Sequence, residues 1–158
     1  MKKKYTNKKP YKGKFIPTDP KKYKGNIRNI EYRSMWERNV MVQFDRNENI
    51  VEWSSEELAI PYESPWDGQI HRYFPDFYIK VKAGSKEIIH IIEIKPKRQT
   101  QPPKTPKRKT KNYLNEVKMW GVNSAKWKAA QDYCETRGWN WAIWTEDTLR
   151  LDRYSSHK

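Results

Sequence analysis

Two carboxylates and a lysine stand at the ends of two apolar stretches of this chain. Asp76 lies in the stretch Tyr73–Val81, and Glu93 and Lys95 close the stretch 87–95. Because side chains alternate along a strand, Glu93 and Lys95 point to the same face. The Gly-containing connection at 82–86 predicts a hairpin. The carboxylate of Asp76 is therefore expected within a few ångströms of Glu93.

Two carboxylates at that separation repel each other unless a cation lies between them. Oxygen ligands from Asp and Glu suit Mg²⁺ or Mn²⁺, hard ions that also accept phosphate oxygens. Lys95 would then be placed to orient or deprotonate a water and to offset charge on a pentavalent phosphate. This pattern predicts a phosphodiester hydrolase. The alternative is an ordinary hairpin ion pair, Asp76 with Lys95 or Glu93 with Lys80, which contributes about 0 to 1 kcal/mol when exposed.

A helix is expected before these strands, from Ser34 to about Phe44, because Trp36, Val40 and Phe44 recur at helical spacing. Ser34 and Glu37 fit a capping box, in which the serine caps the helix and the glutamate reaches back. The spacing of Glu37 from Val40 and Phe44 also puts it on or beside the buried face. Glu37 is therefore either a helix cap or a carboxylate that faces a site.

The remaining chain predicts an α/β fold. Residues 112–120 and 124–137 have helical patterns, separated at Gly121 and ended by Gly138. A final aromatic strand, 139–145, follows a crossover long enough for a parallel neighbour. We therefore expect a mixed β-sheet flanked by helices. Further short strands are expected at 50–53 and 58–62, and a loop is expected at 63–71.

The charge balance points to a polyanionic partner. The 158 residues hold 33 Lys and Arg against 19 Asp and Glu, a formal net charge of +14. Nucleic acid is the first candidate; an acidic membrane surface is the alternative, but no run of 18 apolar residues and no broad amphipathic helix occurs. Cys134 is the only cysteine, which excludes an intramolecular disulfide and a Cys-based zinc site and suits a reducing cytoplasm. We expect no secretory signal at the lysine-rich start.

Two segments concentrate the basic residues. Residues 1–28 predict a disordered or extended basic arm, either a solubilising tail or a segment that docks on DNA or on the domain at 29–153. Residues 95–111 predict a basic, proline-rich loop attached to the end of the Glu93 strand. The residues expected to bind DNA are Arg72, Lys97, Arg98, Lys104, Lys107, Arg108, Lys109 and Lys111.

At Pro75-Asp76 and Glu93-Ile94-Lys95 the sequence resembles the PD-(D/E)xK nuclease superfamily. Over 31–146 it looks like the TnsA-type endonuclease branch, and is more similar still to the head completion nucleases of large contractile-tailed bacteriophages. The segments that carry this wider resemblance are 34–37, 60–62, 72–77, 93–96, 123–133 and Gly138-Trp139.

The resemblance implies a restriction-endonuclease-like fold over 29–153 and Mg²⁺-dependent cleavage of double-stranded DNA. It implies metal ligation by Asp76, Glu93 and the backbone carbonyl of Ile94, with Lys95 positioning the water and Glu37 as an extra catalytic carboxylate and candidate ligand. Since nothing resembles a base-reading helix, we expect little sequence specificity.

The resemblance also implies a role in virion assembly before head–tail joining. The expected location is the host cytoplasm during assembly, or the virion, with head portal or neck proteins as candidate partners. The alternative is a non-catalytic DNA-binding or head–tail connecting protein on a nuclease scaffold.

Overall fold

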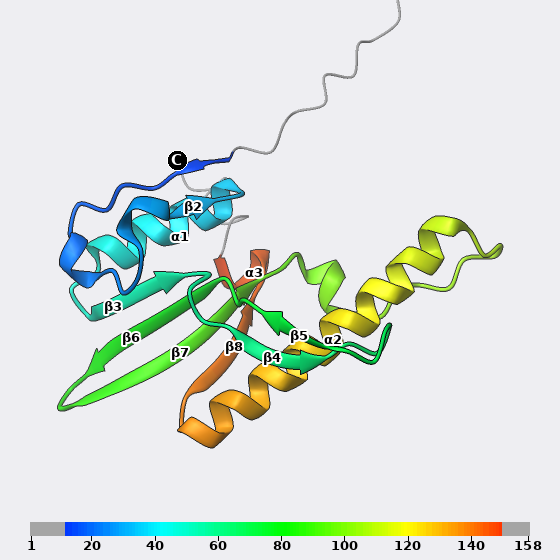
Figure 1. Cartoon of the computed structure of the whole chain (residues 1–158). Helices are drawn as coiled ribbons and strands as arrows, with labels where there is room; N and C mark the ends of the chain where they lie inside the picture. Colours follow the sequence, from blue (N-terminus) through cyan, green and yellow to red (C-terminus); the bar gives the residue numbers. More distant parts are fainter. Residues whose placement is uncertain (1–11, 150–158) are drawn as a thin grey trace, which may run out of the picture.

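A computed structural model describes residues 12–149 of the chain (Figure 1). Its helices are α1 (Met35–Arg46), α2 (Lys111–Arg137) and α3 (Glu146–Leu149), with 3₁₀ turns η1 (Pro20–Lys22), η2 (Ile27–Asn29) and η3 (Lys97–Thr100). Its strands are β1 (Gly13–Lys14), β2 (Glu31–Tyr32), β3 (Ile50–Ser55), β4 (Ile60–Glu63), β5 (Ile70–Tyr73), β6 (Phe77–Ala83), β7 (Lys86–Ile94) and β8 (Asn140–Trp144).

The main sheet has four strands in the order β3-β6-β7-β8. β3, β6 and β7 are antiparallel, whereas β8 runs parallel to β7, with Glu93 opposite Ile143. Ile91 and Ile92 are both fully buried, as expected for a central strand that is apolar on both faces. The predicted mixed sheet flanked by helices is confirmed, and it is consistent with a restriction-endonuclease-like fold.

The two long helices cover opposite faces of this sheet. Val40, Met41 and Phe44 of α1 belong to one core cluster, together with Trp53 of β3 and Ile92 of β7. Cys134 of α2 belongs to another cluster, with Tyr78 and Ile91. Neighbouring residues of β7 therefore face different helices, as the strand period of two requires.

β4 and β5 form a separate two-stranded sheet, with Ile60 opposite Tyr73. The single strand expected from Tyr73 to Val81 is thus two strands. The loop expected at 63–71 is shorter, because β4 includes Glu63 and β5 begins at Ile70. Pro75 lies at the break, because it has no N–H to donate to a strand ladder. The consequence is that Tyr73 ends one sheet, whereas Asp76, three residues later, directly precedes a strand of the other.

The prediction of two helices separated at Gly121 is wrong, because α2 is continuous over 27 residues. One glycine inside a helix costs only about 1 kcal/mol relative to alanine. Burial of Ala130 and Cys134 against the sheets offsets that cost. Gly138 ends the helix at φ 70, as expected for a C-terminal cap.

The described part of the basic arm, residues 12–28, contains β1, η1 and the start of η2 and is packed on the rest of the chain. Phe15 and Tyr23 are 9% and 8% exposed and join the core. The Lys22 Nζ donates to the carbonyls of Phe44, Asp45 and Asn47 at 2.7, 3.1 and 2.7 Å, at the C-terminal end of α1. Residues 1–11 and 150–153 lie outside the described residues, so the division into an arm and a domain stays a prediction.

Within residues 12–149, no helix combines the length and the apolar character that crossing a membrane requires.

Candidate active site

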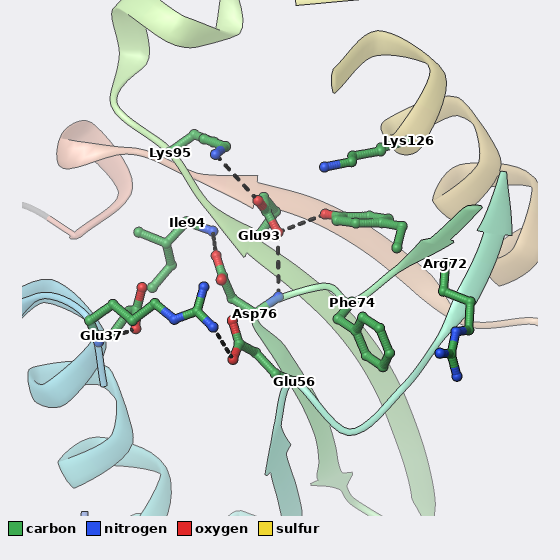
Figure 2. Close-up of a pocket in the computed structure, with 11 residues that line it drawn as sticks. Glu37, Glu56, Arg72, Phe74, Asp76, Glu93, Ile94, Lys95 and Lys126 are labelled. Atoms are coloured by element: carbon green, nitrogen blue, oxygen red, sulfur yellow. Dashed lines mark hydrogen bonds and ion pairs between the residues drawn. The ribbon is translucent and has the colours of Figure 1, made fainter. Parts of the chain in front are cut away.

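Glu93 lies near the C-terminal end of β7, where its side chain is held by three neighbours (Figure 2). Its Oε2 accepts a hydrogen bond from the Tyr73 hydroxyl at 2.6 Å and a longer one from the Asp76 N–H at 3.3 Å. Its Oε1 lies 3.7 Å from the Lys95 Nζ. With 7% exposure, Glu93 is one of few buried charged residues in the described chain, so its orientation is fixed from several sides.

Asp76 lies directly before β6 and beside Glu93. Its Oδ2 accepts a hydrogen bond from the Ile94 N–H at 2.7 Å. The two carboxylates are therefore held by reciprocal backbone hydrogen bonds. Asp76 accepts from the residue that follows Glu93, and Glu93 accepts from the N–H of Asp76 itself. Since the N–H and C=O of one strand residue point to the same side, the Ile94 carbonyl is directed toward the Asp76 side of β7.

The pKa values of both carboxyls are raised. Burial, and then the charge of Glu93, raises the pKa of Asp76 well above its ordinary value. Burial also raises the pKa of Glu93, against the opposing effects of the Tyr73 hydroxyl and the Lys95 ammonium. Two like charges in a poorly solvated place are each disfavoured, and a cation between them would relieve both. The donor set therefore fits a hard divalent ion.

Glu37, in the first turn of α1, serves the helix and faces the site. The Ser34 Oγ accepts from the Glu37 N–H at 3.2 Å, which is the expected cap. The Glu37 Oε2 accepts from the Arg33 N–H at 2.8 Å, one residue before the position that a capping box would use. Burial raises the pKa of Glu37, with smaller effects from Glu56 and Glu93.

These groups open into a pocket of about 570 Å³ (Figure 2). Its lining is Arg33, Glu37, Glu56, Arg72, Tyr73, Phe74, Asp76, Glu93, Ile94, Lys95 and Lys126. The four carboxylates and four basic groups cancel in formal charge. A bound divalent cation would make the pocket positive, which suits a phosphodiester. Among residues 12–149, no three His, Cys, Asp or Glu side chains form a ready metal cluster.

The structure brings together the predicted catalytic and metal-binding residues and Arg72, but not the basic loop. Glu37, Asp76, Glu93, Ile94, Lys95 and Arg72 line the pocket. The other residues predicted to bind DNA are exposed and outside it: Lys97, Arg98, Lys104, Lys107, Arg108, Lys109 and Lys111.

The basic loop begins at the end of the Glu93 strand, as expected, but after η3 it runs out to the N-terminal end of α2 (Figure 1). Lys97 also forms an ion pair, since its Nζ lies 2.8 Å from the Asp147 carboxylate.

Sequence reasoning missed five pocket residues: Arg33, Glu56, Tyr73, Phe74 and Lys126. Tyr73 and Phe74 adjoin Pro75-Asp76, and their aromatic character next to the motif was the available signal. Arg33 directly precedes the helix cap. Nothing in the sequence singles out Lys126 or Glu56.

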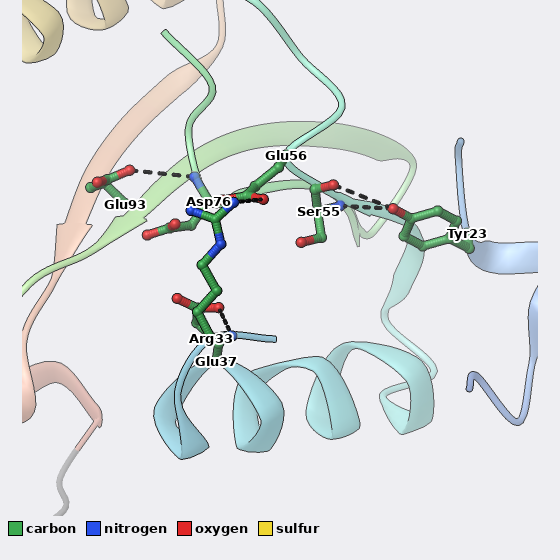
Figure 3. Close-up of polar contacts among 7 residues, drawn as sticks. All are labelled: Tyr23, Arg33, Glu37, Ser55, Glu56, Asp76 and Glu93. Carbon is green, nitrogen blue, oxygen red and sulfur yellow. Dashed lines mark hydrogen bonds and ion pairs between the residues drawn. The ribbon is translucent and has the colours of Figure 1, made fainter. Parts of the chain in front are cut away.

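Glu56 follows β3 and has φ 52, a left-handed conformation that residues other than glycine seldom adopt. Its N–H donates to the Asp76 carbonyl at 3.1 Å, and its Oε2 lies 3.4 Å from the Arg33 Nη2 (Figure 3). This strained turn thus supports the backbone of Asp76 directly. Strain of this kind persists where the surrounding contacts fix the backbone.

A family model described as TnsA-like endonuclease N terminal matches residues 47–146. The chain belongs to the TnsA-like endonuclease family. The Head completion nuclease of Enterobacteria phage T4 is 43% identical over 144 residues, which cover 89% of this chain and 94% of that protein. In this TnsA-like endonuclease, the family match contains Asp76, Glu93, Lys95 and Lys126, whereas Glu37 precedes it.

Proposed function

We propose that this chain is a metal-dependent DNA endonuclease with little sequence specificity that acts in phage head completion. Membership of the TnsA-like endonuclease family and the 43% identity to a Head completion nuclease support the general activity. One observation carries the catalytic assignment: two carboxylates, Asp76 and Glu93, are held together by backbone hydrogen bonds and lie with raised pKa values beside Lys95. A purely structural role gives no reason for that arrangement.

Asp76, Glu93 and the Ile94 carbonyl are the groups that would hold the metal, Mg²⁺ or Mn²⁺, with Glu37 as a candidate fourth. When bound, such an ion polarises phosphate oxygens and acidifies a coordinated water. The raised pKa values of the two carboxyls are the observation that fits this donor set. Oxygen-only donors at a strand end exclude a cysteine-type zinc site here.

The side chains of the chain itself have separate tasks. The 3.7 Å between Lys95 Nζ and Glu93 Oε1 exceeds a hydrogen bond, so Lys95 keeps donors for a water or a phosphate oxygen. We propose that Lys95 positions the attacking water and offsets charge on the pentavalent phosphate. The Tyr73 hydroxyl and the Asp76 N–H orient Glu93 through its Oε2.

The exposed basic residues would bind DNA through its phosphates. Arg72 lies at the pocket, and the exposed Lys and Arg of 97–111 extend the basic surface along the loop to the start of α2. If about six phosphates are neutralised, the log–log salt slope of the binding constant should be near −5. Phosphate contacts of this kind carry no sequence information.

For the biological setting, we propose action on DNA during virion assembly, before head–tail joining. The location would be the host cytoplasm or the virion, with portal or neck proteins as partners. The printed name of the phage T4 relative supports this setting.

A plasmid-nicking assay tests the activity. Wild type with Mg²⁺ should nick supercoiled plasmid, Glu93→Ala should not, and both should bind duplex DNA. Glu87→Ala is a matched control, because Glu87 lies on the same strand, is exposed and does not line the pocket. Equal nicking by wild type and Glu93→Ala would refute the assignment. Absence of nicking in both, with tight binding, would favour the non-catalytic connecting role.

A further inference from the structure

Lys126 brings a second lysine to the pocket from a part of the chain remote from the carboxylate motif. It lies in the middle of α2, is half-buried and lines the pocket. Lys95 and Lys126 approach Glu93 from different sides (Figure 2). We propose that Lys126 binds a backbone phosphate of the DNA strand held in the pocket. This inference rests on the proposed function.

The first support is that Lys126 lacks a carboxylate partner within the described residues. Among residues 12–149, Lys80, Lys95, Lys97 and Lys128 each lie within 4 Å of an Asp or Glu oxygen, and Lys126 does not. Its Nζ lies instead 5.8 and 5.6 Å from the ring centroids of Tyr62 and Tyr73. An aromatic face attracts an ammonium without neutralising its charge. The charge therefore remains available to a phosphate.

The second support is that the helix backbone that carries Lys126 is fixed by packing. Its neighbours Trp127 and Ala130 pack α2 against β4 and β5, and Ala130 is fully buried. Tyr73 contacts both Glu93 and Lys126, because its hydroxyl donates to the Glu93 carboxylate while its ring lies near the Lys126 Nζ. Because the backbone is already fixed, only the Lys126 side chain has to be ordered when the substrate binds, which reduces the free energy spent on ordering.

The third support is the chemistry of a lysine at this place. Lysine acts on phosphate as a compact point charge with three rotatable donors. With Lys95 on another side of Glu93, a phosphate group in the pocket would meet ammonium groups from two directions. The expected ligand is therefore the sugar–phosphate backbone, irrespective of its sequence.

The test compares Lys126→Met and Lys126→Arg with Lys128→Met. Lys128 is a matched control on the same helix, since its side chain is 75% exposed and pairs with Asp132. Lys126→Met is expected to lower kcat/KM by about tenfold or more, in line with a charge-assisted phosphate contact. It should also reduce the steepness of the log–log salt slope of DNA binding by about one. Lys126→Arg should restore much of both, and Lys128→Met should resemble wild type.

Thermal melting of each variant checks that loss of activity is not loss of folding. A folded Lys126→Met that matches Lys128→Met in cleavage and in salt slope would overturn the inference while leaving the nuclease assignment intact. If wild type fails to nick plasmid, the proposed function fails instead. The salt slope for binding then still decides whether Lys126 contacts a phosphate.

Discussion

The main sheet carries two clusters of carboxylates around a lysine, and they differ in almost every physical respect. In the outer cluster, Lys80 lies 2.9 Å from Glu52 and 3.8 Å from Glu87. The Lys80 hydrogen bond holds the pKa of Glu52 below its ordinary value. In the inner cluster, Asp76 and Glu93 adjoin Lys95, and burial raises both carboxyl pKa values.

The same residue types thus form an ordinary ion pair in one place and an electrostatically unfavourable group in the other. In the outer cluster, a central cation satisfies partly exposed acids. In the inner cluster, backbone hydrogen bonds hold a buried Glu93 and a partly buried Asp76 together at the pocket, with the lysine 3.7 Å from Glu93. The two clusters differ in the direction of the carboxyl pKa shift and in burial, although each combines two carboxylates with one lysine.

The largest expected difference between the clusters is in cleavage. Asp76→Asn should lower the plasmid-nicking rate on the order of 10³-fold or more, because it would remove an anionic ligand of the proposed metal without changing side-chain size. Glu52→Gln, the equivalent change in the outer cluster, should leave the rate unchanged. A large loss with Glu52→Gln would mean that both clusters take part in the reaction.

Next in size is the contrast between the two lysines. Lys95→Met should slow single-turnover cleavage by about 10² to 10⁴-fold, as expected when a positioned acid–base group is lost. Lys80→Met should change the free energy of unfolding by about 1 kcal/mol or less, since the pair is partly exposed. Urea unfolding and a single-turnover assay of both variants make the comparison. An active Lys95→Met would assign Lys95 to structure.

A smaller effect is expected on the pH dependence of stability in EDTA. Because the folded-state pKa of Asp76 is raised, the folded protein binds more protons than the unfolded chain above the ordinary pKa. Its contribution to the free energy of unfolding is therefore lost as pH rises through the folded pKa. Glu52, with its lowered pKa, loses its contribution as pH falls.

Asp76→Asn should consequently melt at a higher temperature than wild type at neutral pH, by about 2–4 °C for each kcal/mol gained. Glu52→Gln should melt slightly lower than wild type there. Melting curves of the three proteins between acidic and neutral pH are the measurement. A lower melting temperature for Asp76→Asn at neutral pH would contradict the raised pKa.

The smallest expected effects on stability concern Glu37. Burial raises its pKa, as in the inner cluster, but it also makes hydrogen bonds at the start of α1. Ser34→Ala should lower the free energy of unfolding by about 1 kcal/mol, because it removes the cap on the Glu37 N–H. Glu37→Gln retains an oxygen for the Arg33 N–H and should change stability less. Abolished nicking by folded Glu37→Gln that still binds DNA would identify Glu37 as a ligand; full activity would identify it as a cap.

Much of this fold was predictable because local patterns and tertiary packing agree. Val40 and Phe44 recur at helical spacing, so α1 can bury them only by turning that face to the sheet, as it does. β7 is apolar on both faces, so it has to be a central strand covered on both sides, as it is. Tyr73 to Val81 was misassigned because an aromatic run hides the break at Pro75. Gly121 was misread because α2 gains enough by packing to continue through a poor helix residue.

The pocket was predictable only where a motif in the sequence marks it. Asp76 and Glu93 come together through hairpin register, which the sequence indicates. Lys126 reaches the same pocket through the packing of a 27-residue helix on β4 and β5, which no spacing rule gives. The positive φ of Glu56 likewise depends on its tertiary contact with Asp76.

The short β1–β2 pair has a practical consequence for producing the protein. β1 pairs with Glu31 and Tyr32, and the next residue, Arg33, already lines the pocket. A polyhistidine tag joined ahead of Lys12 would be tethered close to that entrance and would bring its own metal ligands to it. A substitution of Gly13 left after tag removal would also require Tyr32 to move, because a Cβ there would collide with the end of its side chain. Purification handles for metal assays therefore belong elsewhere on the chain.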